Sequence, residues 1–142
     1  MSAIPIRREQ QETDFCILEV CNTGNTLDPY SDRLKLQGYE VISASNYEEA
    51  LRDARDCHPV LVVVYDEPDK GIDGIRWLEI QHTDRDPQLA MTPLLILADQ
   101  SRVPTLRPEE LPDRVIVLPL RSDTLNQMTR TVKRLLRLQQ MD

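Results

Sequence analysis

The run Val60-Leu61-Val62-Val63-Val64 is apolar at every position and β-branched at four of its five. Consecutive β-branched residues are typical of a strand that is buried on both faces of a parallel sheet. Elsewhere in the chain, short apolar runs alternate with amphipathic stretches, which is the pattern of parallel strands joined by crossover helices. The sequence therefore predicts an α/β domain built around residues 60–64.

Helices are expected where a capping residue precedes an amphipathic run. The first spans residues 29–37, the next two begin at Asn46 and at Gly74, and the last follows Ser122 or Asp123. The strands between and around them are predicted at Phe15–Val20, Tyr39–Ala44, Val60–Val64, Thr92–Leu97 and Arg114–Leu118.

Pro104, Pro108 and Pro112 lie close together after the fourth predicted strand. Proline lacks a backbone donor and clashes inside a helix, so the fourth helix must be short or irregular. Five strands with intervening helices are expected to form a flavodoxin-like, doubly wound parallel sheet in the order 2-1-3-4-5. This domain would cover residues 15–142, preceded by a flexible polar arm over residues 1–14.

Composition narrows the class of partner. The formal net charge of −7 opposes binding to nucleic acid or to an anionic membrane surface, which leaves a protein as the expected partner. No apolar run approaches the ~20 residues of a membrane span. The three cysteines are unevenly spaced without a CxxC pair, so the sequence indicates neither a disulfide framework nor a metal site, and a cytoplasmic location is expected.

Across residues 15 to 139 the chain resembles a response-regulator receiver domain. The resemblance is one of layout first, supported by short motifs in matching places. These are Ala50-Leu51 in the second helix, Pro59 before the third strand, Asp73-Gly74 before the third helix, Thr92-Pro93 before the fourth strand, and Leu118-Pro119 after the fifth.

The resemblance implies a phosphorylation site in which most positions have been replaced. The family has an acidic pair for Mg²⁺ where this chain has Cys21 and Asn22, a hydroxyl at Ala98, and a lysine at Leu118. Only the phosphoacceptor aspartate has an equivalent, Asp66. The chain therefore resembles a degenerate receiver, or pseudo-receiver, with no catalytic residue and no cofactor, and Mg²⁺ is expected only if Asp66 is a working acceptor.

The register of the acceptor position is open from sequence alone. Counting back from Asp73-Gly74 selects Asp66, whereas counting forward from Ala50-Leu51 and Pro59 selects Tyr65. We favour Asp66. Glu19 is a further oddity, because it interrupts an apolar strand; it would pair with a cation, lie towards a sheet edge, or carry a function that the sequence does not identify.

Positive charge is concentrated on the last helix and just before it. The ordinary interpretation is a solvated helix face, and the sharper one is a docking surface for an acidic protein patch. The residues concerned are Arg121, Arg130, Lys133, Arg134 and Arg137.

Three functions fit the sequence. The first is a phosphorylation-independent protein-binding module in a two-component, phosphorelay-type pathway, not an enzyme, which binds a signalling kinase or effector or forms a homodimer. The second is a genuine single-domain response regulator phosphorylated on Asp66. The third is a flavodoxin-like nucleotide or flavin binder, disfavoured because the loop over residues 21–26 has a single glycine.

Overall fold

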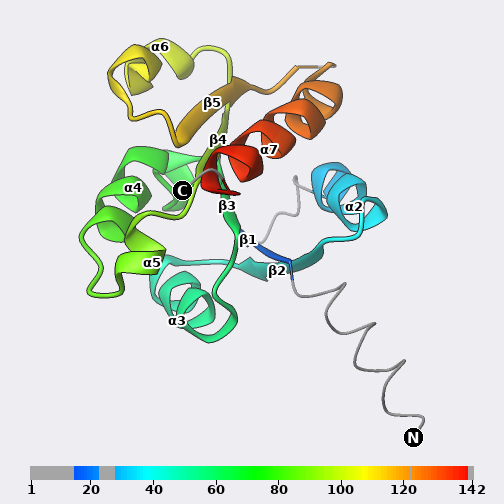
Figure 1. The fold of residues 1–142 in the computed structure, drawn as a ribbon. Helices are drawn as coiled ribbons and strands as arrows, with labels where there is room; N and C mark the ends of the chain where they lie inside the picture. Colours follow the sequence, from blue (N-terminus) through cyan, green and yellow to red (C-terminus); the bar gives the residue numbers. More distant parts are fainter. Residues whose placement is uncertain (1–14, 23–27, 122, 141–142) are drawn as a thin grey trace, which may run out of the picture.

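The computed structural model describes residues 15–22, 28–121 and 123–140. All strands lie parallel in one sheet of order β2-β1-β3-β4-β5, which confirms the predicted fold (Figure 1). Each strand lies within two residues of its predicted bounds. The arm expected over residues 1–14 falls outside the described residues. The strands are β1 (Cys16–Val20), β2 (Glu40–Ala44), β3 (Leu61–Asp66), β4 (Leu94–Ala98) and β5 (Val115–Pro119).

Helices connect the strands as the capping residues predict. Asn46 caps its helix, since its side chain accepts a hydrogen bond from the N–H of Glu49 at 2.8 Å. Of the two predicted caps of the last helix, Ser122 lies outside the described residues, and the carbonyl of Asp123 accepts the N–H of Gln127. The longer helices are α2 (Asp28–Leu36), α3 (Tyr47–Cys57), α4 (Gly74–His82) and α7 (Thr124–Gln140).

Short helical turns occupy the connections on either side of β4. The proline-rich segment holds only the four-residue α6 (Val103–Leu106) and the 3₁₀ turn η2 (Pro108–Glu110), so the predicted irregular fourth helix is confirmed. Two other turns were not expected from the sequence: η1 (Pro68–Lys70) and α5 (Pro87–Ala90). The second begins where Asp86 accepts the N–H of Gln88 and a proline follows at the first helical position.

The sheet separates two apolar layers (Figure 1). One layer lies under α3, α4, α5 and α6, and includes the fully buried Trp77. The other lies under α2 and α7, where Met128, Val132 and Leu135 are buried as the spacing of the last helix predicts. The strands between the layers are therefore covered on both faces, which is why Leu61–Val64 is continuously apolar.

Glu19 lies on β1, between β2 and β3, so the interpretation that places it towards a sheet edge is wrong. Its side chain is buried and accepts hydrogen bonds from Ser31 of α2 and Ser43 of β2. These hydroxyl donors replace part of the hydration that a carboxylate loses on burial. The structure therefore gives Glu19 a local role in joining α2 and β2 to β1.

Candidate functional site

The carboxyl ends of β3, β4 and β5 meet at one edge of the sheet. Asp66 ends β3 and lies in register with Ala98, which ends β4 and in turn lies beside Pro119. Asn22 follows β1, and its side-chain amide donates to the carbonyl of Lys70 at 3.2 Å. The sequence-predicted positions at the strand ends are thus brought to one edge, as expected for a parallel sheet.

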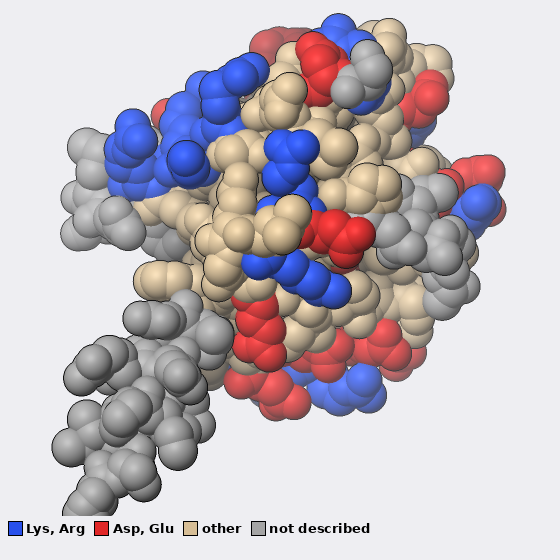
Figure 2. Space-filling model, turned by 90° about the vertical axis from the view of Figure 1, so that its right-hand side faces the viewer, with Lys and Arg blue, Asp and Glu red and all other residues tan. Residues whose placement is uncertain are grey.

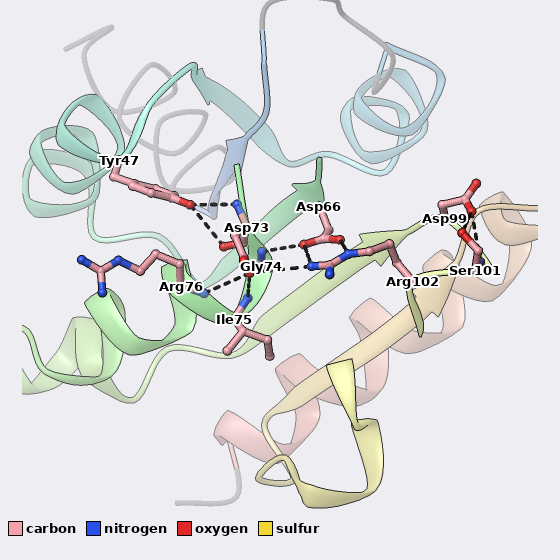
Figure 3. Close-up of polar contacts among 9 residues, drawn as sticks. All are labelled: Tyr47, Asp66, Asp73, Gly74, Ile75, Arg76, Asp99, Ser101 and Arg102. Atoms are coloured by element: carbon pink, nitrogen blue, oxygen red, sulfur yellow. Dashed lines mark hydrogen bonds and ion pairs between the residues drawn. The ribbon is translucent and has the colours of Figure 1, made fainter. Parts of the chain in front are cut away.

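Asp66 has a buried carboxylate whose two oxygens are both hydrogen-bonded (Figure 3). Its Oδ1 accepts the N–H of Gly74 at 2.7 Å and Nη2 of Arg102 at 3.1 Å. Its Oδ2 accepts Nε of Arg102 at 2.8 Å. The result is a two-point ion pair with a backbone donor added, and no part of the Asp66 side chain is exposed.

Gly74 allows the start of α4 to approach this carboxylate. A side chain at this position would place its Cβ 2.9 Å from Cγ2 of the buried Ile96 and 3.4 Å from Oδ1 of Asp66. Asp73 caps the helix by accepting the N–H groups of Ile75 and Arg76. The Asp73-Gly74 motif therefore both starts α4 and supplies the backbone donor to Asp66.

Arg102 reaches Asp66 from the loop after β4. Its backbone carbonyl accepts the N–H groups of Thr105 and Leu106 at the start of α6, so its main chain is held by this short helix. Its guanidinium also lies 3.8 Å from Oδ1 of Asp73. The hydrogen bond to Asp66 raises the pKa of Arg102 above its usual value, so the cation is favoured further.

A hollow of about 490 Å³ opens beside this ion pair, and we call it the Asp66 hollow. Acidic side chains dominate its wall. Asp99 is held by the backbone N–H and the hydroxyl of Ser101, which lower the pKa of its carboxyl (Figure 3). The lining residues are Tyr65, Asp66, Glu67, Pro68, Asp69, Asp99 and Arg102.

Solved structures of receiver domains superpose on most of this chain. The non-phosphorylated HemR receiver domain from Leptospira biflexa is 25% identical, with a TM-score of 0.63 over 86% of this chain and 94% of that one. The receiver domain of the hybrid histidine kinase CckA is also 25% identical, with a TM-score of 0.62 over 85% and 98%. The chain has the fold of a response-regulator receiver domain. The likeness supports a receiver domain of two-component signalling.

A third match carries a phosphoryl mimic. It is the response regulator TrrA from Thermotoga maritima, solved in complex with Mg²⁺ and BeF, and is 24% identical with a TM-score of 0.64 over 85% of this chain and 98% of that one. No protein-family model matches the sequence, and no curated protein sequence matches it either. The similarity to receivers is therefore carried mainly by the fold.

The donor set at this edge does not fit Mg²⁺. This ion prefers several hard oxygen ligands and waters in octahedral geometry. At the end of β1 the chain offers a thiol at Cys21 and an amide at Asn22. The carboxylate of Asp66 is already held by Arg102, and the other acids of the wall include Glu67, which pairs with Lys70, and Asp99, which is held by Ser101. Within the described residues no group of three or more His, Cys, Asp or Glu side chains is arranged to hold a metal.

Arg102 is the site residue that the sequence did not single out. Tyr65 packs against the layer under α2 and α7, whereas the side chain of Asp66 contacts Arg102, and the assignment of Asp66 as the acceptor equivalent stays a prediction. Ala98, in register with Asp66, has no hydroxyl, and Leu118, which has no charge, packs in the layer under α2 and α7 and is not brought to Asp66. A buried acid at a strand end favours a nearby cation, and the sequence signal for it was Arg102, which lies in the loop after β4.

A second hollow, of about 570 Å³, runs between β5 and α7, and we call it the β5–α7 groove. Arg121 lies 3.5 Å from Asp123, whereas Arg130 and Arg134 form no ion pair with another described residue. Lys133 and Arg137 are exposed on the same helix. The groove is lined by Ile116, Leu118, Pro119, Arg121, Gln127, Arg130, Thr131 and Arg134.

Lys and Arg side chains gather at the upper left of the face in Figure 2, and Asp and Glu prevail along its lower edge. Charge is thus segregated on a molecule whose net charge is −7. In the described part of the chain no helix is both long and apolar enough to cross a bilayer.

Proposed function

We propose that this receiver-fold domain works as a phosphorylation-independent protein-binding module in a two-component, phosphorelay-type pathway. The observation that carries the proposal is the two-point ion pair between Asp66 and Arg102. The side chain of Asp66 has no exposed surface, so a phosphoryl donor has no oxygen to approach while Arg102 is in place.

Replacement of the neighbouring positions supports the same proposal. Phosphoryl transfer is accelerated mainly by metal ions and cations that neutralise charge on the transferring oxygens. Cys21 and Asn22 are poor ligands for Mg²⁺, and Ala98 and Leu118 cannot contact a phosphoryl group as a hydroxyl and a lysine would. The domain would act without a catalytic residue or cofactor.

The β5–α7 groove is the surface that we assign to partner binding. It combines an apolar floor at Ile116 and Leu118 with arginines that no described acid neutralises, Arg130 and Arg134. An acidic protein surface on a signalling kinase or effector would satisfy both features, and a second copy of this chain is the alternative occupant. Nucleic acid and membrane are disfavoured by the net charge, and a cytoplasmic location remains our expectation.

Incubation with acetyl phosphate and Mg²⁺ tests the chemical half of the proposal. We expect no phosphorylated species by intact mass, under conditions in which a phosphorylatable receiver in the same tube is modified. The Asp66→Asn variant is the matched control, because it removes the candidate acceptor and keeps the side-chain volume. A stoichiometric adduct on the wild type that is absent from Asp66→Asn would overturn the proposal.

The alternative is a genuine response regulator phosphorylated on Asp66. The observation that favours this alternative is that β3 ends in an acid, Asp66, although the other site positions of the family differ in this chain. It requires Arg102 to leave the carboxylate so that Mg²⁺ and a phosphoryl group can enter. A structure obtained with Mg²⁺ and beryllofluoride separates the two functions, since occupancy at Asp66 would establish the alternative.

Charge reversal of Arg130, Lys133 and Arg134 to Glu tests the docking half. We expect weaker association, measured by partner pull-down and by light scattering at low and high salt, with an unchanged circular dichroism spectrum. Reversal of Arg52, Arg76 and Arg85 is the matched control, with the same change in net charge on exposed positions outside α7. If both triple variants associate like the wild type at every salt concentration, α7 is only a solvated face.

A further inference from the structure

Cys16 and Cys57, which are 41 residues apart in the sequence, have their sulfur atoms 3.0 Å apart. Cys16 begins β1, and its carbonyl accepts the N–H of Val60 beside the start of β3. Cys57 ends α3, because His58 adopts a left-handed conformation and its N–H returns to the carbonyl of Ala54. The end of α3 is thereby held against the beginning of β1.

The two thiols differ in exposure and acidity. Cys16 is buried, whereas Cys57 is partly exposed. Burial is the largest cause that raises the pKa of both thiols, and the hydrogen bond that the Cys16 thiol donates adds to the rise at Cys16 and opposes it at Cys57. Nearby carboxylates of Glu40 and Asp53 raise both pKa values further. Cys57 is therefore the thiol that meets an oxidant first, and its high pKa makes the reaction slow.

We propose that Cys16 and Cys57 are a site of oxidative modification, at which a peroxide converts the two thiols into an intramolecular disulfide. The inference rests on this contact alone and is independent of the proposed function. It adds a covalent link between β1 and α3, which otherwise pack against each other and share the thiol hydrogen bond.

The reaction takes two steps. The thiolate of Cys57 attacks one oxygen of hydrogen peroxide, the O–O bond breaks, and hydroxide leaves, so that Cys57 becomes a sulfenic acid. The sulfur of Cys16 then attacks that of Cys57, the new S–S bond forms as the S–O bond breaks, and the hydroxyl leaves as water with the proton of Cys16. The peroxide is reduced to water and the two thiols are oxidised.

The geometry requires only a small movement. A disulfide has an S–S distance of ~2.05 Å, about 1 Å shorter than the present separation of the sulfurs. Cys21 cannot replace either partner, because it lies beyond the other end of β1, ~16 Å from Cys16 at the usual rise per strand residue. The third cysteine is thus an internal control.

The test is oxidation of the folded protein with hydrogen peroxide, followed by alkylation and intact mass. We expect the wild type and Cys21→Ser each to lose two hydrogens. The oxidised wild type should retain one alkylatable thiol, that of Cys21, and oxidised Cys21→Ser should retain none. Cys16→Ala and Cys57→Ala should form no internal link. The oxidised protein should melt about 5–10 °C higher than the reduced protein, and a dithiol reductant should reverse the change.

A second measurement tests the order of the steps and does not depend on the disulfide. In Cys16→Ala the sulfenic acid has no partner, so a dimedone-type reagent should label Cys57, whereas in Cys57→Ala it should leave Cys16 unlabelled. Three results would overturn the proposal. The first is a disulfide that includes Cys21, and the second is a disulfide between chains. The third is complete alkylation of all three thiols of the folded protein after a peroxide treatment that does oxidise the denatured protein.

Discussion

The Asp66 hollow and the β5–α7 groove are both bordered by arginines, but the charges are used differently. At the Asp66 hollow, the Arg102 side chain is 29% exposed and its guanidinium contacts a carboxylate with no exposed surface. In the β5–α7 groove, Arg130 and Arg134 are exposed and have no ion pair among the described residues. One region neutralises its charge internally, and the other presents its charge to solvent.

The difference indicates which region can receive a partner from outside. Removal of Arg102 from Asp66 would leave a buried carboxylate with one backbone donor, so Arg102 is held to the molecule and is unavailable to a ligand. Exposed arginines without an ion pair in their own chain can pair with the carboxylates of a partner. Four changes test the contrast, from the largest expected effect to the smallest.

Removal of Arg102 should have the largest effect on stability. Arg102→Ala leaves the buried carboxylate of Asp66 with the Gly74 N–H as its one remaining donor here, and should lower the free energy of unfolding by about 2–4 kcal/mol. Urea denaturation measures the change. Arg76→Ala is the control, because its ion pair with Glu79 is exposed on both sides and contributes under ~1 kcal/mol. Equal effects for the two variants would show that the Asp66 pair does not stabilise the fold.

Gly74→Ala should have the next largest effect. The added Cβ meets Ile96, a buried side chain of β4 with little room to move, so α4 must shift away from the sheet. We expect a loss of about 1–3 kcal/mol by the same denaturation measurement. The shift would also lengthen the hydrogen bond to Asp66, visible as faster amide exchange at Gly74. A variant as stable as the wild type would mean that the close approach of α4 is not needed.

A further ion pair, between Arg55 and Asp84 at 2.5 Å, is intermediate in exposure between the two regions: the Arg55 side chain is 45% exposed and that of Asp84 is 5% exposed. Burial raises the pKa of Asp84, but hydrogen bonds from Arg55 and the Asp86 N–H outweigh it, so the pKa lies below the ordinary 3.8. A carboxyl with a lowered folded-state pKa stabilises the fold above its unfolded pKa and loses that contribution as the pH falls through the folded value. The stability difference between wild type and Asp84→Asn should therefore shrink as the pH falls below about 4.

Truncation of Arg134 to Ala should have the smallest effect. Because this side chain is exposed and forms no ion pair with a described residue, the free energy of unfolding should stay within about 0.5 kcal/mol of the wild type. Thermal unfolding with and without added salt measures it. A loss comparable to that of Arg102→Ala would contradict the contrast between the two regions.

The sequence by itself determined the fold, and it narrowed the acceptor-equivalent position at the end of β3 to Tyr65 or Asp66. The apolar run before it, the cap at Asn46 and the prolines after β4 are local signals, because strand periodicity, helix capping and proline geometry depend on residues close together in the chain. These signals predicted the succession of strands and helices, and the right-handedness of crossover connections then limited the order of the strands in the sheet.

Only the tertiary structure decided what Asp66 and the cysteines contact. Arg102 is 36 residues from Asp66 in the sequence, and Cys57 is 41 residues from Cys16. The serines that donate to Glu19 lie on a neighbouring helix and a neighbouring strand. These contacts depend on how loops and helix ends settle against the sheet. Such positions are fixed by packing and by the need to pair buried polar groups, which act between residues far apart in sequence.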